Sequence, residues 1–485
     1  MMITSADFLP LLPEIFLLSA TCALLLTDLF ISPSRRGLVH FLALAILAVT
    51  AILTLRGVPG GDLPVRVFSG SFQRDGAGDL LKLFAYLATA LTFVYARPYL
   101  KDRGLFKGEF YLLVLFALLG MMLMMSAGTL IVAYLGLELL ALSSYALVAL
   151  DRDNRRATEA AVKYFVLGAL ASGMLLYGLS MLYGATGTVD IARLYEAASA
   201  LQGEDRTLLL YGVVFVVVGI GFKFGAAPFH MWLPDVYQGA PTAMTLFIGS
   251  APKLAGLGLA YRLFDNAVGG IDMNWQVTLA WLAALSLVLG NLIAIMQTNL
   301  KRMLAYSTVS HVGFLFLGLA NGTPEGYAAA ALYAICYALM ATGSFAAIIL
   351  LARQGFEAEE ISDYRGLFRT HPWFALMILL LMFSLAGVPP LFGFWAKLAV
   401  ISAAIDAGLL WLAILALVFA VIGAFYYLRV VKVMFFDPPS DDVRIEPQAD
   451  VQLRWVFSAN ALAMLVLGLF WSPLMDMCLR AFGAA

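Results

Sequence analysis

Long apolar runs recur along the whole sequence, and they constrain its fold more than any other feature. A helix needs about 20 predominantly apolar residues to cross about 30 Å of hydrocarbon. Soluble domains are about 45–50% apolar and about 25% charged, whereas this chain of 485 residues is 62% apolar and 13% charged. We therefore predict an all-α integral membrane protein with about 14 transmembrane helices, at roughly 10–31, 38–56, 77–97, 109–127, 128–150, 159–184, 207–237, 241–263, 274–296, 303–320, 326–352, 372–402, 408–436 and 452–475.

Composition excludes several classes of function. A formal net charge of −1 offers no basic footprint for nucleic acid, so the expected surroundings are membrane lipid and other proteins. The three cysteines, Cys22, Cys336 and Cys478, form no CxxC pair, zinc set or iron–sulfur run. We expect no redox cofactor and no metal in this chain.

The basic residues predict the orientation. Most lysines and arginines lie in loops that join odd-numbered to even-numbered spans, such as 97–107 and 151–156, and these loops should face the cytoplasm. The N-terminus has neither a basic secretory leader nor an Arg-rich transit peptide. We expect a multi-pass protein of a bacterial inner membrane with both termini on the periplasmic side. The opposite loops carry Arg56, Arg66, Arg74, Arg193, Arg206 and Arg262.

Five lysines lie inside or at the edge of the spans. A lysine at mid-membrane costs about 2.5–3.5 kcal/mol on the insertion scale, so several in one chain are hard to explain as packing. We expect Lys82 to snorkel toward an interface and Lys163 to pair with Glu159 one turn earlier. The three other lysines remain as candidates for function: Lys223, Lys253 and Lys397.

Two spans are interrupted by proline and glycine, around Pro228 and Pro389. Such breaks persist in lipid only where they line protein or a hydrated cavity, and paired breaks indicate an internally repeated transporter. The breaks fall in the fourth helix of two five-helix blocks, 109–263 and 274–436. An odd number of spans makes these blocks inverted repeats, flanked by helices 1–3 (1–108) and helix 14 (452–475). Incidental kinks are the alternative.

Glu138 lies midway along the fifth span with no charged neighbour in sequence. It must pair, protonate or face water. If Lys223 is its partner, moving the two from 4 to 8 Å apart changes their attraction from about 4 to about 2 kcal/mol at an effective dielectric constant near 20. An adjustable pair of this kind could load and release a proton. A structural hydrogen bond from Glu138, or a static ion pair, is the alternative.

Lys253 is central in the eighth span and Lys397 follows the second break by eight residues. Buried lysines without a carboxylate make good members of a proton relay. His230 and His311 could bridge them because histidine titrates near neutral pH, although a packing role explains both histidines equally well. Ligation of haem by the two histidines is the least favoured alternative.

Three segments resemble the antiporter-like membrane subunits of proton-translocating NADH:quinone oxidoreductase, respiratory complex I. They are FKFGAAPFHMWLPDVYQGAPT at 222–242, LKRMLAYSTVSHVG at 300–313 and GFWAK at 393–397. LPE at 12–14 and KYFVLG at 163–168 are similar as well. Within this family the stretch VYQGA at 236–240 and the lysine at 397 resemble subunit N, because a sibling subunit typically carries glutamate at the latter position.

The resemblance implies a role for each matching residue. Glu138 and Lys223 would form the coupling pair, Lys253 the central relay and Lys397 the terminal proton donor, with His230 and His311 connecting them through water. Sibling antiporter-like subunits and other membrane-arm subunits would be the partners. FMN, the iron–sulfur clusters and the quinone site would belong to partner subunits.

Two other functions fit buried lysines and broken helices. A subunit of a Na⁺ or K⁺/proton antiporter would use an ion gradient and have no attached NADH oxidation. A structural spacer in the membrane arm would tolerate substitution of its lysines.

Overall fold

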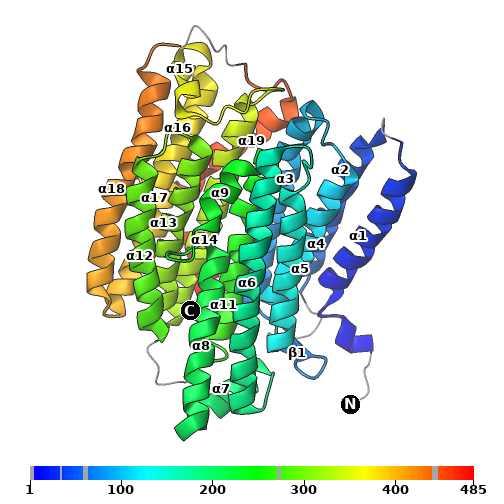
Figure 1. The fold of residues 1–485 in the computed structure, drawn as a ribbon, viewed down its shortest axis with the longest axis vertical. Coiled ribbons are helices and arrows are strands. Elements are labelled where there is room, and N and C mark those ends of the chain that lie inside the picture. Colours follow the sequence, from blue (N-terminus) through cyan, green and yellow to red (C-terminus); the bar gives the residue numbers. More distant parts are fainter. Residues whose placement is uncertain (1–4, 33–34, 58–63, 270–274, 440–445, 485) are drawn as a thin grey trace.

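The computed structural model describes residues 5–32, 35–57, 64–269, 275–439 and 446–484. Within these ranges the chain is a bundle of long helices with a single small β-hairpin (Figure 1). Residues 1–269 contain η1 Ser5–Phe8, α1 Leu12–Phe30, α2 Gly37–Leu55, β1 Val65–Val67, β2 Phe72–Arg74, α3 Gly76–Asp102, α4 Gly108–Met125, α5 Leu130–Val148, α6 Arg155–Thr186, α7 Ile191–Ala200, α8 Gly203–Phe224, α9 Trp232–Gly239, α10 Thr242–Gly249 and α11 Ala251–Phe264.

The second part of the bundle continues the same architecture. It contains α12 Trp275–Ile295, α13 Leu300–Ala320, α14 Pro324–Leu351, η3 Ile361–Tyr364, α15 Leu367–Thr370, α16 Pro372–Ala386, α17 Phe392–Asp406, α18 Leu410–Phe435, α19 Val451–Leu469 and α20 Ser472–Ala481.

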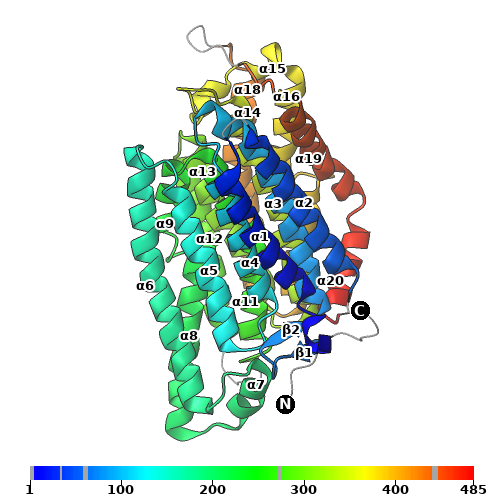
Figure 2. The same ribbon diagram turned by 90° about the vertical axis from the view of Figure 1, so that its right-hand side faces the viewer.

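Among the described residues, 13 helices are long and apolar enough to cross a membrane. The remaining predicted span, 372–402, is present as two helices of 15 residues each, α16 and α17, on either side of the break at Pro389. The prediction of a helical membrane protein with about 14 crossings is therefore confirmed. The hairpin and the short helices α7 and α20 lie at the end of the bundle where the chain starts and finishes (Figure 2).

We call that end the termini face, defined by β1–β2, α7 and α20. The opposite end, the basic face, is formed by loops 103–107, 149–154, 296–299 and 352–360. Consecutive long helices run between these two faces in alternating directions, so depth in the bundle follows from position along a helix.

Glycine contacts bring several antiparallel helices close together, as glycine does in membrane bundles. Gly120 on α4 faces Gly136 on α5, and a Cβ on Gly120 would lie 2.6 Å from the Gly136 carbonyl oxygen. Gly178 on α6 and Gly212 on α8 meet in the same way. α14 is the most enclosed of the spans, with its whole apolar window buried.

One predicted span is more broken than expected. The eighth span, 241–263, divides into α10 and α11 at Ser250, whose backbone is not helical (φ −118°, ψ −87°). Pro252 follows in the first turn of α11, where its missing N–H needs no partner. The segment that carries Lys253 is therefore the start of a new helix.

Candidate functional site

Two transmembrane helices end inside the bundle. α8 ends at Phe224 and α16 at Ala386, and each is closed by a glycine in the left-handed region, Gly225 (φ +77°) and Gly387 (φ +85°). Such a glycine cap ends a helix without a steric penalty. The last-turn carbonyls of both helices consequently point into the protein interior, where a donor must satisfy them.

Buried lysines supply these donors. Lys253 is 3% exposed, and its Nζ donates to the carbonyl of Phe224 at 2.7 Å. Lys397 donates to the carbonyls of Leu385 and Ala386, both at 2.9 Å. A helix C-terminus carries partial negative charge, so it favours a cation at this position. At each break, therefore, a buried lysine satisfies carbonyls of a helix end.

Lys223 lies in the last turn of α8, one residue before its end. Its Nζ donates to the hydroxyl of Ser172 on α6 at 3.0 Å. Lys223 and Lys253 both line an enclosed cavity of about 40 Å³, together with Ser144 and Tyr164. A cavity of this size holds at least one water molecule where polar partners are present. The structure thus brings two of the predicted lysines to one small cavity, whose polar lining includes Ser144 and Tyr164.

Glu138 stands apart from this pair of lysines. It is half-buried on α5, and its Oε1 is buried without a hydrogen-bond partner in the described part of the chain. No ion pair joins Glu138 to Lys223 among the described residues, although the carboxylate is near enough to act on Lys223 electrostatically. Glu138 and Lys223 are neighbours in this structure, but they are not paired, because Lys223 is turned to Ser172.

The two histidines differ in their surroundings. His311 on α13 is buried, and both ring nitrogens are hydrogen-bonded, Nδ1 to the Tyr333 hydroxyl at 2.6 Å and Nε2 to the Tyr427 hydroxyl at 3.0 Å. His230 lies in the break between α8 and α9, with Nδ1 buried and unpartnered within the described ranges. Its ring meets that of Tyr306 edge to face at 6.2 Å. Of the two, only His311 is part of an extended polar network.

The expectation that Lys82 snorkels is wrong. Lys82 is 1% exposed, and its Nζ lies 2.6 Å from Oε1 of Glu14 on α1. The partner is 68 positions away along the chain, so no local pattern indicates it. The predicted pair of Lys163 with Glu159 is confirmed at 2.9 Å, and Lys163 also contacts Asp235 on α9 at 2.8 Å.

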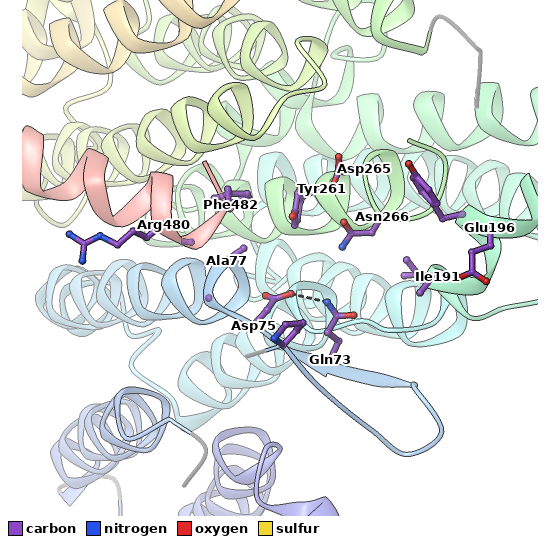
Figure 3. A pocket seen from close by; sticks show the side chains of 16 residues that line it. Gln73, Asp75, Ala77, Ile191, Glu196, Tyr261, Asp265, Asn266, Arg480 and Phe482 are labelled. Carbon is purple, nitrogen blue, oxygen red and sulfur yellow. Dashed lines mark hydrogen bonds between the residues drawn. The ribbon is translucent and has the colours of Figure 1, made fainter. Parts of the chain in front are cut away.

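Another cavity lies at the termini face, away from these residues. It has a volume of about 910 Å³ and is lined by residues of α3, α7, α11 and α20 (Figure 3). At its floor Asp75 accepts a hydrogen bond from Gln73 at 3.0 Å and pairs with Arg262 at 2.5 Å. Burial alone would raise the pKa of Asp75, but Arg262 and the hydrogen bonds hold it below its ordinary value. None of the predicted relay residues lines this cavity.

Sequence reasoning missed several polar residues around the lysines and His311. Their common feature is a hydroxyl or amide inside a span, which is a weak signal because serine and threonine often bond the preceding turn of their own helix. Only the packing of different helices shows which of them meet a charged or titratable group. They are Ser172, Tyr333, Tyr427, Tyr426, Asn291 and Ser307.

A bundle of long apolar helices, with lysines held at two internal helix ends, defines an antiporter-like membrane protein. The family described as NADH:quinone oxidoreductase/Mrp antiporter, transmembrane, matches residues 127–423. NADH-quinone oxidoreductase subunit N of Xanthomonas euvesicatoria is 54% identical over 99% of this chain and 97% of its own. The corresponding subunit of Thioalkalivibrio sulfidiphilus is 52% identical over 98% of each chain.

The chain therefore belongs to the NADH-quinone oxidoreductase subunit N family. Solved structures agree with this assignment. A chain of respiratory complex I from Thermus thermophilus superposes with a TM-score of 0.80 at 33% identity, over 96% of this chain and 99% of that one. A chain of the Mrp complex from Dietzia shares the fold with a TM-score of 0.85 at 23% identity, over 99% and 97%.

Proposed function

We propose that this chain moves protons across the membrane as a membrane-arm subunit of NADH:quinone oxidoreductase, through a relay of Glu138, Lys223, Lys253 and Lys397. The observation that carries the proposal is the placement of three lysines at or beside two internal helix ends, of which Lys253 and Lys397 are buried and Lys223 is half-buried. A lysine beside backbone carbonyls can hold a proton, and a second lysine across a water-sized cavity can receive it. The chain itself performs no redox step.

The coupling step uses the two acceptors available to Lys223. In this structure the ammonium is turned to Ser172, and Glu138 is its electrostatic alternative. Moving Lys223 toward Glu138 strengthens its hold on a proton, and moving it back toward Ser172 and the shared cavity weakens that hold. Rearrangement in neighbouring subunits would drive this movement.

The surroundings follow from the same proposal. Residues 109–263 and 274–436 are two inverted repeats, each with a helix broken around a proline, Pro228 or Pro389, and they are flanked by 1–108 and 452–475. The basic face is cytoplasmic and the termini face periplasmic in a bacterial inner membrane. Sibling antiporter-like subunits and membrane lipid surround the chain, and partner subunits hold FMN, the iron–sulfur clusters and the quinone. His230 and His311 extend the relay through water.

The test compares Lys253→Met with Lys107→Ala, which removes an exposed lysine of the basic face. We expect inverted membrane vesicles with Lys253→Met to lose most NADH-driven proton uptake while a native gel still shows an intact, NADH-active complex. Lys107→Ala should pump normally. Normal pumping by assembled Lys253→Met would refute the relay.

A native gel of wild-type membranes also separates the rival function. Co-migration of the chain with a large NADH-active band supports the proposed complex. Migration in a smaller assembly without NADH activity, together with Na⁺-dependent proton exchange in vesicles, would favour a cation/proton antiporter.

A further inference from the structure

A chain of hydrogen bonds leads away from His311 through residues that the lysine relay does not use. Four helices contribute to it: α12, α13, α14 and α18. Every side chain in it is at least nine-tenths buried. The members are Tyr333, His311, Tyr427, Ser307, Tyr426 and Asn291.

His311 is placed to pass a proton from one side of its ring to the other. A neutral imidazole has one N–H donor and one acceptor nitrogen. Because Tyr333 and Tyr427 occupy the two nitrogens at 2.6 and 3.0 Å, one tyrosine donates to the ring and the other accepts from it. Exchanging the tautomer reverses both bonds.

The far end of the chain is anchored by an amide. Asn291 uses both of its N–H groups, on the Leu287 carbonyl at 2.7 Å and on Ser310 at 2.8 Å. Its oxygen therefore faces Tyr426, whose hydroxyl donates to it at 3.0 Å. With its own proton directed at Asn291, the Tyr426 hydroxyl, 3.4 Å away, can accept from Tyr427 when Tyr427 does not donate to His311. Tyr427 therefore has two acceptors for its single proton, Nε2 of His311 and the Tyr426 oxygen, and Ser307 is the neighbour that can exchange a proton with it.

The chain of hydrogen bonds runs from mid-membrane toward the basic face. Helices rise about 1.5 Å per residue, so Ser307 lies about 6 Å closer to the start of α13 than His311 does. On the other side, Tyr333 stacks on Phe314 with ring centroids 5.6 Å apart, and the Lys397 ammonium lies 5.2 Å from the centre of the same Phe314 ring. Phe314 is thus a shared neighbour of Tyr333 and the relay lysine Lys397.

We propose that Tyr333, His311 and Tyr427 form a proton-conducting branch that connects the basic-face half of the bundle with Lys397, oriented by Tyr426 and Asn291. This rests on the proposed function. In one transfer Tyr427 gives its proton to Nε2 and takes one from the Ser307 side, while Nδ1 gives its proton to Tyr333, which releases one toward Lys397. One proton enters, one leaves, and rotation of the hydroxyls with tautomer exchange resets the chain.

The decisive variant is Tyr427→Phe. The protein offers a matched control, Tyr337→Phe. Tyr337 is equally buried on α14, and its ring centroid lies 5.0 Å from that of His311. Its hydroxyl, however, donates to Thr308 at 2.7 Å and is outside the branch. Both variants remove one buried hydroxyl beside the same histidine, so they share the structural cost.

In vesicles carrying the complete complex, we expect Tyr427→Phe to slow NADH-driven proton uptake by about a hundredfold, the lower end of the range for loss of a proton-transfer group. Its solvent deuterium isotope effect on pumping should rise, a change that loss of packing would not cause. Tyr337→Phe should keep the wild-type rate and isotope effect. Equal behaviour of the two variants in both measurements would overturn the branch.

If Tyr427→Phe fails to assemble, Ser307→Ala removes the neighbouring hydroxyl and is read in the same way: normal pumping overturns the branch and slowed pumping supports it. Lys253→Met separates the two proposals. Loss of pumping in Lys253→Met with normal pumping in Tyr427→Phe leaves the relay standing and removes the branch. Normal pumping in Lys253→Met removes the relay itself.

Discussion

The three lysines of the proposed relay differ in what holds them. Lys253 and Lys397 donate to backbone carbonyls that cannot move without their helices, whereas Lys223 donates to the side-chain hydroxyl of Ser172. A hydroxyl on a rotatable side chain is the weakest of these anchors. Lys223 is therefore the lysine best suited to change partner.

Ser172→Ala tests this difference at the residue scale. Losing a hydrogen bond to a charged group removes about 1.5 kcal/mol or more of stabilisation. The population of Lys223 turned toward Glu138, relative to that turned toward residue 172, should therefore rise by about tenfold. We expect a normally assembled complex whose NADH-driven proton uptake is several-fold slower. Ser180→Ala, which removes an exposed hydroxyl from the same helix, should pump at the wild-type rate. Equal rates in both variants would show that Ser172 does not govern Lys223.

Which of these residues could be predicted depended on the kind of signal. The relay lysines were visible because a charge in a long apolar run has few structural explanations. Ser172 and Tyr427 were not, because hydroxyls in a span are common. Lys82 was misjudged because Glu14 approaches it from a different helix, and chain distance carries no information about that approach.

At the scale of helices and loops, a single carboxylate ties α3 and α10 to the loop after α14 at the basic face. Glu357, in the loop after α14, accepts hydrogen bonds from Tyr99 of α3 at 2.6 Å and from Thr242 at the start of α10 at 2.5 Å, and it pairs with Arg103. Lys301 of α13 donates to the carbonyl of Ala240 nearby at 2.7 Å. The loop thereby fixes the start of α10, the helix that leads toward Lys253.

This loop gives a prediction about pH. Burial alone would raise the pKa of Glu357, but the charges of Lys301 and Arg103 and its hydrogen bonds hold it below the ordinary value of 4.5. Because the folded-state pKa is lowered, the stabilisation is complete at neutral pH and is lost as the pH falls through that lowered pKa. Glu357→Gln should cost about 1.5–3 kcal/mol at pH 7 and cost less in acid.

Thermal unfolding of the detergent-purified complex, followed at pH 7 and near pH 4, measures both quantities. Glu359→Gln is the control, because the side chain of Glu359 makes only a 3.5 Å contact with the exposed Arg156 within the described residues. A loss of stability in Glu357→Gln that is the same at both pH values would contradict the assigned charge effect.

The close approach of α4 and α5 depends on two glycines. A Cβ on Gly136 would lie 2.8 Å from the Gly120 carbonyl oxygen, whereas one on Gly173 would meet no atom within 4 Å. We expect Gly136→Ala to force the helices apart at a cost of about 1–3 kcal/mol and Gly173→Ala to be neutral. The midpoint of thermal unfolding of the purified complex compares them. Equal midpoints would show that α4 can shift without penalty.

The breaks at Pro228 and Pro389 were predictable because a mid-span proline removes a donor that lipid cannot replace. The break at Ser250 was not, because Pro252 falls where a helix start tolerates it. The β-hairpin and α7 were also missed. Their strands have three residues each and α7 has ten, so they lie below the length at which a hydrophobic pattern is reliable.

At the scale of the whole molecule, the two faces of the bundle differ in charge, and this difference predicts orientation. The loops of the basic face hold most of the arginines and lysines outside the spans, and such loops remain in the cytoplasm during insertion. Arg152 is exposed in a basic-face loop, and Arg193 is exposed on α7 at the termini face. They are matched positions for reporting the two sides.

We therefore expect Arg193→Cys to react with a membrane-impermeant maleimide in right-side-out spheroplasts, and Arg152→Cys to react only after permeabilisation. The background is Cys22→Ala, because Cys22 is the exposed native cysteine of the described residues. Labelling of both positions in permeabilised cells controls for reactivity. The reverse labelling pattern would place the basic face outside the cytoplasm. Protons would then have to move through the relay in the opposite direction during NADH oxidation, and this would contradict the proposed coupling.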